Sequence, residues 1–454
     1  MILNIDFMSK FFGFGHSNND FCHTSCISGK VMQQALFTLV LSESDGISDS
    51  LYPFSIMHSS WELRYGGRRI FEVYRDSLPE FSIRFAGRDL QKRSFLEQEG
   101  FAMDGLSIHS APLMILRSEI VPNAQTVTIL RRMAIDGGQS FVIKDEERII
   151  GVYLVQEAEL SYVNLHAPTF EQIIEKIPFD SLPITQLHTE SIIYQWDAMM
   201  LAPKAISESF GFFSKQLREA LPGHVFALNV DRILIGRNCE CAPGIVLDAS
   251  KGPIIIESDV HIMAHSFIQG PCHIGKGSII KAGAQIYSGT VIGPMCKIGG
   301  EVEQSIFHGY ANKQHQGFVG HSYIGEWVNL GAMTTTSDLK NTYGEIDVFL
   351  RGKNVQTGLR FLGALIGDHT KTAIGTCLST GTVIGISSSI HDIGEFPPKD
   401  ISSFSWGTKE SNEGSNHVYE LEKAVGIAEI VMKRREKTLT SAQKQLFIQE
   451  FEKI

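Results

Sequence analysis

Residues 256–298 read IESDVH-IMAHSF-IQGPCH-IGKGSI-IKAGAQ-IYSGTV-IGPMCK-I, with isoleucine at every sixth position. A period of six fits neither an amphipathic helix, whose apolar face returns every 3.6 residues, nor a long strand, whose faces alternate every two. It is typical of a solenoid in which each coil has three short faces, with one aliphatic side chain pointing inward from each face. The stretch therefore predicts a parallel β-helix built from hexapeptide repeats.

The same spacing continues on both sides of this stretch. It is found at Ile235, Cys241 and Leu247, at Phe318, Ile324, Leu330 and Thr336, and at Ile366, Thr372, Leu378, Ile384 and Ile390. Many of these positions are followed by glycine, which lets the chain turn from one face to the next. We therefore expect the β-helix to occupy residues 232–400, with these side chains pointing inward.

Two interruptions break the period. Phe318 follows Ile298 by 20 residues, which is not a multiple of six. Thr336 and Ile366 are 30 residues apart, but the segment between them begins with a polar, irregular run over residues 336–344. Both gaps predict loops that leave the solenoid. Binding and catalytic residues often lie on loops of a rigid scaffold, so these loops are the first places to look for a site.

The rest of the chain divides into three parts. Residues 1–34 form a polar and aromatic N-terminal extension, and residues 35–222 form an α/β domain with a mainly parallel sheet. A helical pattern covers residues 67–76, and strand-like runs lie at Phe37–Leu41, Phe81–Phe85, Thr126–Leu130, Ser140–Ile143 and Ile149–Leu154. Residues 408–454 form a helical tail, in which Thr440 and Gln443 make a capping box.

The composition excludes some classes of partner and indicates the cell compartment. The 454 residues carry a formal net charge of −10 and have a pI near 5.9, so a basic field for nucleic acid or anionic membrane is absent. No apolar run reaches the roughly 18 residues of a membrane span. Seven scattered cysteines favour reduced thiols, and Cys22-x3-Cys26 lacks the second ligand pair of a zinc site. We expect a cytoplasmic protein.

Four segments resemble one known family. They are residues 309–344, 358–363, 367–372 and 396–407. The chain resembles divergent relatives of the bifunctional bacterial N-acetylglucosamine-1-phosphate uridylyltransferase/glucosamine-1-phosphate acetyltransferase, a group of sugar nucleotidyltransferase-like proteins. The resemblance implies a left-handed β-helix behind a degenerate nucleotidyltransferase-like domain, assembly as a homotrimer, and acetyl-CoA as cosubstrate. The implied reaction is N-acetylation of an amino-sugar phosphate or nucleotide amino sugar in cell-envelope sugar metabolism.

The resemblance also implies the residues of an acetyl-transfer site. His315 matches the catalytic base that takes the proton of the attacking amine, and an imidazole titrates close to neutral pH as this step requires. Asn329 matches a second catalytic position, near backbone amides that face the acyl group. Gly331 and Ala332 match the positions that line the coenzyme A arm.

Four further residues are implied in substrate binding. They are Glu303, Lys313, Phe318 and Lys340. Glu303 matches a carboxylate near the sugar, and Phe318 stands where the family has tyrosine. A family lysine two residues after Glu303 is replaced by Ser305, which removes a phosphate ligand unless Lys313 or Lys340 substitutes for it. The pattern therefore leaves the acceptor open between glucosamine 1-phosphate and a different amino sugar.

The N-terminal domain departs further from the family pattern. A nucleotidyltransferase has a glycine-rich loop and an arginine after its first strand, which hold the triphosphate. Here the loop over residues 42–49 has one glycine and the acidic residues Glu43, Asp45 and Asp49. Such a loop repels phosphate unless Mg²⁺ bridges the two. In the divergent relatives an Arg-Pro pair occupies the positions of His58 and Ser59.

Three alternatives stay open. The N-terminal domain retains sugar-1-phosphate nucleotidyltransferase activity in one of them. In another the chain is an inactive trimeric scaffold or regulatory protein. In the third it is a zinc enzyme like the β-helical carbonic anhydrases, with His261, His265 and His273 as ligands, although their spacing does not match.

Overall fold

The computed structural model describes residues 37–101, 112–391, 396–407 and 418–454. Residues 35–454 form one compact unit. The expected extension over residues 1–34, with Cys22 and Cys26, and the segment 408–417 lie outside the described residues. No helix in the described ranges is both long and apolar enough to cross a membrane.

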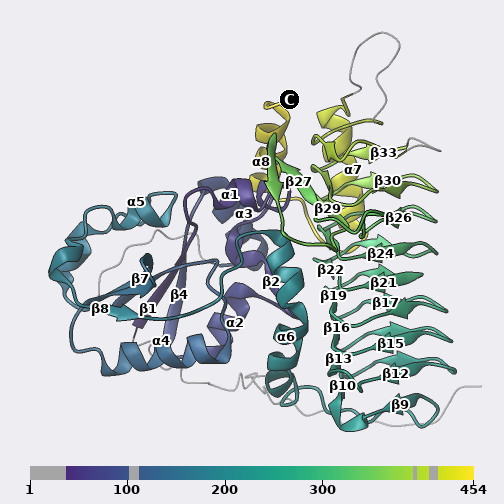
Figure 1. Ribbon diagram of the computed structural model, residues 1–454, viewed down its shortest axis with the longest axis horizontal. Coiled ribbons are helices and arrows are strands. Elements are labelled where there is room, and N and C mark those ends of the chain that lie inside the picture. The colour runs from purple at the N-terminus through teal and green to yellow at the C-terminus, as the bar shows by residue number, and fades with distance from the viewer. Residues whose placement is uncertain (1–36, 102–111, 392–395, 408–417) are drawn as a thin grey trace, which may run out of the picture. The chain divides into compact units, whose positions relative to one another are not determined.

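The N-terminal part is an α/β domain around a six-stranded mixed sheet (Figure 1). The sheet order is β4-β1-β5-β7-β6-β8, with bounds β1 Phe37–Ser42, β4 Phe81–Ala86, β5 Leu113–Arg117, β6 Phe141–Asp145, β7 Arg148–Leu154 and β8 Ile184–Gln186. β1 is parallel to β4 and β5, and β6 is parallel to β8, whereas β7 is antiparallel to both of its neighbours. The helices are α1 Ile47–Ser50, α2 Ile70–Ser77, α3 Asp89–Glu99, α4 Ala124–Asp136, α5 Phe170–Ile174 and α6 Gln195–Phe213. A short antiparallel pair, β2 Arg64–Tyr65 with β3 Arg68–Arg69, precedes α2.

One predicted strand of this domain is wrong. Residues 126–130 lie inside helix α4, because Asn123 caps the helix by accepting a hydrogen bond from the Thr126 amide at 2.8 Å. Val127, Leu130 and Ala134 are buried, at the three- and four-residue spacing of one helical face. The β-branched composition of the run favoured a strand, and the cap and the wider periodicity overrode it.

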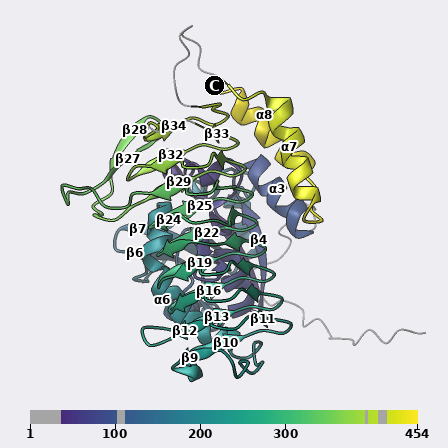
Figure 2. The same cartoon turned by 90° about the vertical axis from the view of Figure 1, so that its right-hand side faces the viewer.

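The second part is the predicted left-handed β-helix, and its strands stack in parallel on three faces (Figures 1 and 2). Face D contains β9 Phe226–Leu228, β12 Val246–Asp248, β15 Phe267–Gln269, β18 Gln285–Ile286, β21 Glu301–Glu303 and β24 Phe318–Gly320. Face E contains β10 Ile233–Ile235, β13 Ile254–Ile256, β16 Cys272–Ile274, β19 Thr290–Ile292, β22 Ile306–Phe307, β25 Tyr323–Ile324, β29 Ala364–Ile366, β32 Thr382–Ile384 and β34 Asp400–Ile401. Face F contains β11 Glu240–Cys241, β14 His261–Ile262, β17 Ile279–Ile280, β20 Lys297–Ile298 and β23 Asn312–Lys313. Two short pairs extend the later coils, namely β26 Thr335–Thr336 with β31 Cys377–Leu378, and β30 Lys371–Thr372 with β33 Ser389–Ile390.

The six-residue period is confirmed as the inward stack of the β-helix. All eight isoleucines of residues 256–298 that carry the period are fully buried. The corners between faces are tight: a methyl group placed on Gly293 would lie 2.1 Å from the carbonyl oxygen of His308 in the next coil. Only glycine lets neighbouring coils approach this closely at that corner.

The predicted loop between Ile298 and Phe318 is wrong. The solenoid continues through this segment, with Val302, Phe307 and Lys313 filling the inward stack. The coil has shorter corners here, so the inward position shifts by one, and Val319 points inward while Phe318 is half-buried on the outside. Shortened corners and an inward lysine together conceal the repeat from a search for aliphatic residues at a fixed spacing.

The second predicted loop is confirmed. Residues 337–363 leave the solenoid after β26, and they form an antiparallel hairpin of β27 Asp347–Leu350 and β28 Lys353–Gln356. The chain rejoins face E at β29, where the six-residue spacing resumes.

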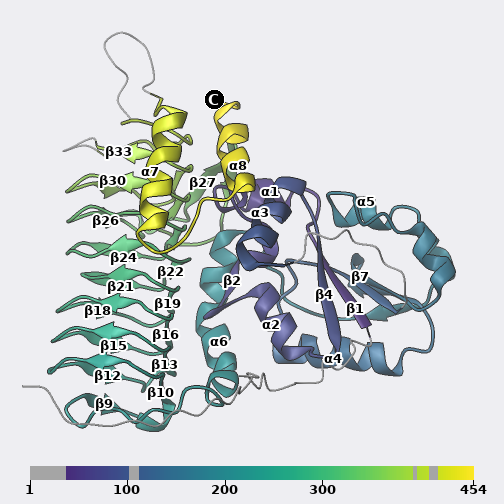
Figure 3. The same cartoon turned by 180° about the vertical axis from the view of Figure 1, so that it is seen from behind.

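The outer side of face E is apolar and packs against the N-terminal domain. Helix α6 contacts β13, β16, β19 and β25, and Figures 1 and 3 show it running along the β-helix between that face and the sheet. Ile255, Val291 and Leu365 on this side are fully buried in the same core as Ile206 of α6. The tail helices α7 Leu421–Lys433 and α8 Ser441–Phe451 follow, and Thr440 caps α8 as predicted.

Candidate functional site

His315 lies at the corner that joins β23 to β24, and its side chain is exposed. The next coil places Gly331 and Ala332 at the same corner, because the amide of Met333 donates a 2.8 Å hydrogen bond to the carbonyl oxygen of Gln316. The structure therefore brings together three of the residues predicted from sequence, His315, Gly331 and Ala332, on two adjacent coils.

The backbone of the second coil offers a free donor at this corner. The amide of Gly331 donates to the Oγ1 of Thr372 at 3.0 Å, and the carbonyl oxygen of Ala332 accepts from the amide of Gly375 at 2.8 Å. The amide of Ala332 has no partner among the described residues. An accessible base next to an unpaired amide suits acyl transfer, because the base takes a proton while the amide stabilises the oxyanion.

Lys313 is not placed to bind substrate. It occupies the inward stack above Ile298 and is 1% exposed. Its Nζ donates to the carbonyl oxygens of Gly299, at 2.7 Å, and of His315, at 3.0 Å. Burial lowers the pKa of this amine to about 8. The prediction followed the order of residues in the segment, whereas the shortened coil turns this side chain inward, where it fixes the backbone that carries His315.

The remaining predicted residues are spread over other parts of the β-helix. Asn329 is exposed on face F, where its backbone pairs with the coils on either side. Glu303 and Phe318 are half-buried on the outside of face D, on the adjacent strands β21 and β24. Lys340 lies in the inserted loop and donates to the carbonyl oxygen of Glu345. The structure thus places Asn329, Glu303 and Phe318 on faces F and D, and Lys340 on the inserted loop.

The carboxyl edge of the N-terminal sheet carries ion pairs where a nucleotidyltransferase holds phosphate. Glu43 follows β1, is 1% exposed, and accepts from the Nη2 of Arg88 at 2.8 Å and from its Nε at 3.0 Å. Asp49 lies 3.4 Å from the Nζ of Lys353. Two of the three acidic side chains that the sequence offered to Mg²⁺, those of Glu43 and Asp49, thus face cationic side chains, which disfavours a Mg²⁺ site in this loop.

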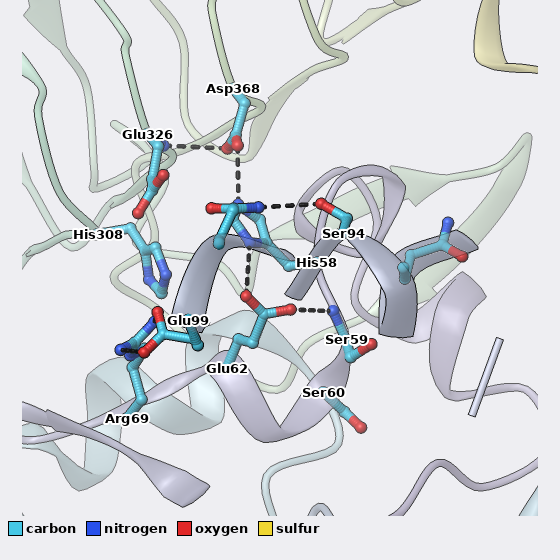
Figure 4. Close-up of polar contacts among 12 residues, drawn as sticks. His58, Ser59, Ser60, Glu62, Arg69, Ser94, Glu99, His308, Glu326 and Asp368 are labelled. Carbon is cyan, nitrogen blue, oxygen red and sulfur yellow. Dashed lines mark hydrogen bonds and ion pairs between the residues drawn. The ribbon is translucent and has the colours of Figure 1, made fainter. Parts of the chain in front are cut away.

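A buried ionic cluster, which no sequence pattern predicted, lies at the junction of the two parts (Figure 4). The Nε2 of His58 lies 2.7 Å from Oδ2 of Asp368, and its Nδ1 lies 3.2 Å from Oε2 of Glu62. All three residues are at most 3% exposed. Burial lowers the pKa of His58, but the two carboxylates outweigh this effect and raise it well above its usual value. A protonated His58 therefore links the N-terminal domain to the β-helix.

Glu326 extends this cluster. Its amide donates to Oδ1 of Asp368 at 3.0 Å, and burial raises the pKa of its carboxyl group. His58, Glu326 and Asp368 place oxygen and nitrogen atoms within 4.8 Å of one another, a spacing that metal ligands also have. Both ring nitrogens of His58 already face carboxylates at hydrogen-bond distance, so shared protons account for the cluster.

Two sequence observations bear on this cluster and on metal binding. The resemblance described above implies an arginine at the position of His58, so a basic side chain was the available signal. Its partner Asp368 lies 310 positions away, and no local pattern connects them. The three histidines considered as zinc ligands, His261, His265 and His273, do not form a metal-type cluster in the described part of the chain.

Comparisons with known proteins agree with the β-helix. A model of the bacterial transferase hexapeptide (six repeats) matches residues 253–288. The chain is 37% identical over 143 residues to a bifunctional sugar-1-phosphate nucleotidylyltransferase/acetyltransferase of Sulfurisphaera tokodaii, covering 31% of this chain and 36% of that protein. It is 35% identical over 105 residues to the bifunctional protein GlmU of a Jannaschia species, covering 22% of each.

These matches are partial. The chain spans 36% or less of the length of these two curated relatives. A UDP-N-acetylglucosamine acyltransferase of Campylobacter jejuni aligns with 50% of this chain and 95% of its own, at 10% identity and a TM-score of 0.23, which is too low to bear on function. The hexapeptide repeat and the identities to the bifunctional proteins nevertheless agree with each other, and over the matched segments the chain is similar to the GlmU-type sugar-1-phosphate nucleotidyltransferase/acetyltransferases.

Proposed function

We propose that this protein is an acyltransferase that moves an acetyl group from acetyl-CoA to the amine of an amino-sugar phosphate or nucleotide amino sugar. The observation that carries the proposal is the corner shared by His315 and Ala332, where an exposed imidazole and an unpaired amide lie on adjacent coils. The named activities of the bifunctional relatives point to the same substrate class.

The chemistry follows from these groups. The amine nitrogen attacks the thioester carbonyl carbon, and His315 accepts the proton that the amine loses. The carbonyl oxygen becomes an oxyanion, which the free amide of Ala332 stabilises. Collapse of the tetrahedral intermediate breaks the carbon–sulfur bond, gives the amide product and releases the thiolate of coenzyme A, which takes up a proton.

We propose that the site is completed in a homotrimer. Asn329 and Glu303 lie on faces F and D rather than at the corner of His315, and a neighbouring subunit would supply their counterparts there. Sedimentation velocity on the full chain tests this assembly, and a monomer at assay concentration contradicts it.

A cytoplasmic location, the inactive scaffold and retained nucleotidyl transfer stay predictions from sequence, and the ion pairs at the sheet edge disfavour the last of these.

A thiol-release assay tests the activity. The full chain is mixed with acetyl-CoA and a panel of amino-sugar phosphates and nucleotide amino sugars. We expect release that depends on an acceptor and falls by about 10²- to 10⁴-fold in His315→Ala, as for the loss of a general base. His261→Ala removes another partly exposed histidine of the β-helix and serves as the control. No release by a folded trimer with any acceptor contradicts the proposal and favours the scaffold.

A further inference from the structure

A cavity of about 700 Å³ lies between α2, one corner of the β-helix and the segment that joins α7 to α8. Its walls include Arg64, Arg68, His273, Tyr310, Glu326 and Trp327. Neither His315 nor any other residue of the proposed acyl-transfer corner lines it. The proposed acyl transfer therefore does not explain this cavity.

Arg64 carries a buried positive charge into this cavity. Its residue is 6% exposed, its Nε donates to the carbonyl oxygen of His308 at 2.7 Å, and its Nη1 donates to that of Gly67 at 2.8 Å. Among the described residues, Nη2 has no hydrogen-bond partner, and no carboxylate oxygen lies within the 4.0 Å of an ion pair. Two backbone carbonyls thus fix the guanidinium. The carboxylates of Glu72 and Glu257, which also line the cavity, interact with it electrostatically but form no ion pair with it.

Unsatisfied polar atoms gather on the same walls. Trp327 is 4% exposed and its Nε1 has no partner among the described residues, and the same holds for Nδ1 of the fully buried His273. The Nε of Arg68 is also unpaired, whereas its Nη1 lies 3.5 Å from Oδ2 of Asp76. Buried polar groups in folded proteins nearly always have partners, so several orphans around one cavity indicate a missing ligand.

The type of orphan identifies the chemistry of that ligand. Arginine and tryptophan nitrogens donate hydrogen bonds and cannot accept them, so the missing group must present acceptors. The nearby carboxylates of Glu72 and Glu99 pair with Arg69, at 2.9 Å and 2.8 Å, and neither forms an ion pair with Arg64. Burial raises the pKa of Glu326, the chain neighbour of Trp327, and so favours its neutral acid.

We propose that this cavity binds a phosphate group, free or carried on a small molecule, with Arg64 and Trp327 donating to its oxygens. Phosphate offers several charged acceptors, and guanidinium groups match its geometry. The cavity has the size of ordinary small-molecule sites, so it has room for a carrier as well. Tyr310 stacks on Trp327 with ring centroids 4.2 Å apart, which gives that carrier a flat aromatic wall.

Calorimetric titration of the full chain with inorganic phosphate, ribose 5-phosphate and ribose tests the proposal. We expect saturable binding of a phosphate probe and none of ribose. Tighter binding of ribose 5-phosphate identifies a carried phosphate, and equal or tighter binding of inorganic phosphate identifies the free ion. Saturable binding of ribose alone, or of no probe, overturns the proposal.

Two variants and one control connect binding to the cavity. Trp327→Phe removes the indole N–H donor and keeps an aromatic ring stacked on Tyr310. Arg64→Lys keeps the positive charge and removes the paired N–H donors of the guanidinium. Each should weaken binding by about 10- to 100-fold, as for a hydrogen bond to a charged group. Trp196→Phe is the matched control, since Trp196 is also 4% exposed and stacks on Tyr194 away from the cavity. If Arg64→Lys does not fold, the affinity of Trp327→Phe for the phosphate probe tests the assignment by itself. Undiminished binding in the folded variants overturns the assignment.

Discussion

The side-chain nitrogen of Lys313 lies 3.0 Å from the carbonyl oxygen of His315. The same atom lies 2.7 Å from the carbonyl oxygen of Gly299, one coil away. A lysine in a stack of aliphatic side chains is costly, because burial disfavours the ammonium. Here the buried lysine lies at the corner that carries the proposed catalytic base. Its amine hydrogen-bonds this corner to the coil before it.

The first prediction concerns the pH dependence that Lys313 confers. Its pKa is about 8 in the folded chain, below the unfolded value of roughly 10.4. Between these values the unfolded chain holds more protons, so the free energy of unfolding contributed by this group rises with pH. Lys313→Met should abolish this rise, which amounts to at most about 1.4 kcal/mol per pH unit.

Urea titrations of both proteins at several values between pH 7.5 and pH 10 measure this difference, since other ionisations cancel between them. Lys276→Met, which changes a lysine whose side chain is 67% exposed, should keep the wild-type slope. Parallel curves for wild type and Lys313→Met would contradict the burial of this amine.

A second prediction concerns His58. Its pKa is raised in the folded chain by Asp368 and Glu62, against the effect of burial. Above the unfolded value of about 6.5 the folded chain keeps a proton that the unfolded chain releases, so the free energy of unfolding falls as pH rises. Burial also raises the pKa of Glu326, and this acts in the same direction.

His58→Gln should therefore remove much of the fall in stability between pH 6.5 and pH 8.5, while it lowers stability at pH 6.5 by about 3 to 5 kcal/mol because buried carboxylates lose their partner. Denaturant midpoints across this range give the test. His188→Gln breaks a surface pair, with a histidine side chain 78% exposed and 3.4 Å from Asp145. It should change little. An unchanged pH profile in His58→Gln would show that the ring is neutral.

A third prediction uses adjacent residues of β17. Ile280 is fully buried in the inward stack, and Ile279 is half-buried on the outside. Ile280→Ala should cost about 2 to 5 kcal/mol, because it opens a cavity that the rigid coils cannot close. Ile279→Ala should cost clearly less. Equal losses in chemical denaturation would place the repeat in the wrong register.

A fourth prediction tests the register shift in β24. Val319→Asn puts an amide among aliphatic side chains, so it should cost at least as much as an unsatisfied buried polar group, about 1 to 3 kcal/mol, plus lost packing. Phe318→Asn changes a half-buried outer residue and should be better tolerated. Thermal melting of the two variants compares them. The opposite ranking would restore the inward Phe318 expected from the strict six-residue spacing.

The fold was predictable from sequence because each inward isoleucine is fixed by local geometry. A coil of three faces demands an aliphatic side chain every six residues, and residues 256–298 meet that demand without interruption. The segment around Lys313 broke the rule in both composition and spacing, so the same reasoning produced a loop where the coil continues. Helix α4 was misassigned for a similar reason, since β-branching outweighed a cap at Asn123.

The candidate site was predictable only in part. His315, Gly331 and Ala332 share a corner because successive coils stack in register, which the period implies. The cluster of His58 with Asp368 was out of reach, because it depends on how the N-terminal domain docks on the β-helix. The direction of Lys313 was equally out of reach, since a one-residue change in a corner turns a side chain from the outside of the coil to the inside.

The apolar outer side of face E determines whether the two parts of the chain can be prepared as separate fragments. Ile255, Val291, Ile306, Tyr323, Leu365 and Val383 on that side are fully covered. Separating the sheet domain from the β-helix would expose this row of apolar side chains to solvent. Exposed apolar surfaces of this kind associate with one another. Deletion fragments chosen to separate the two halves should therefore precipitate, and biochemical work on either half needs the other half present.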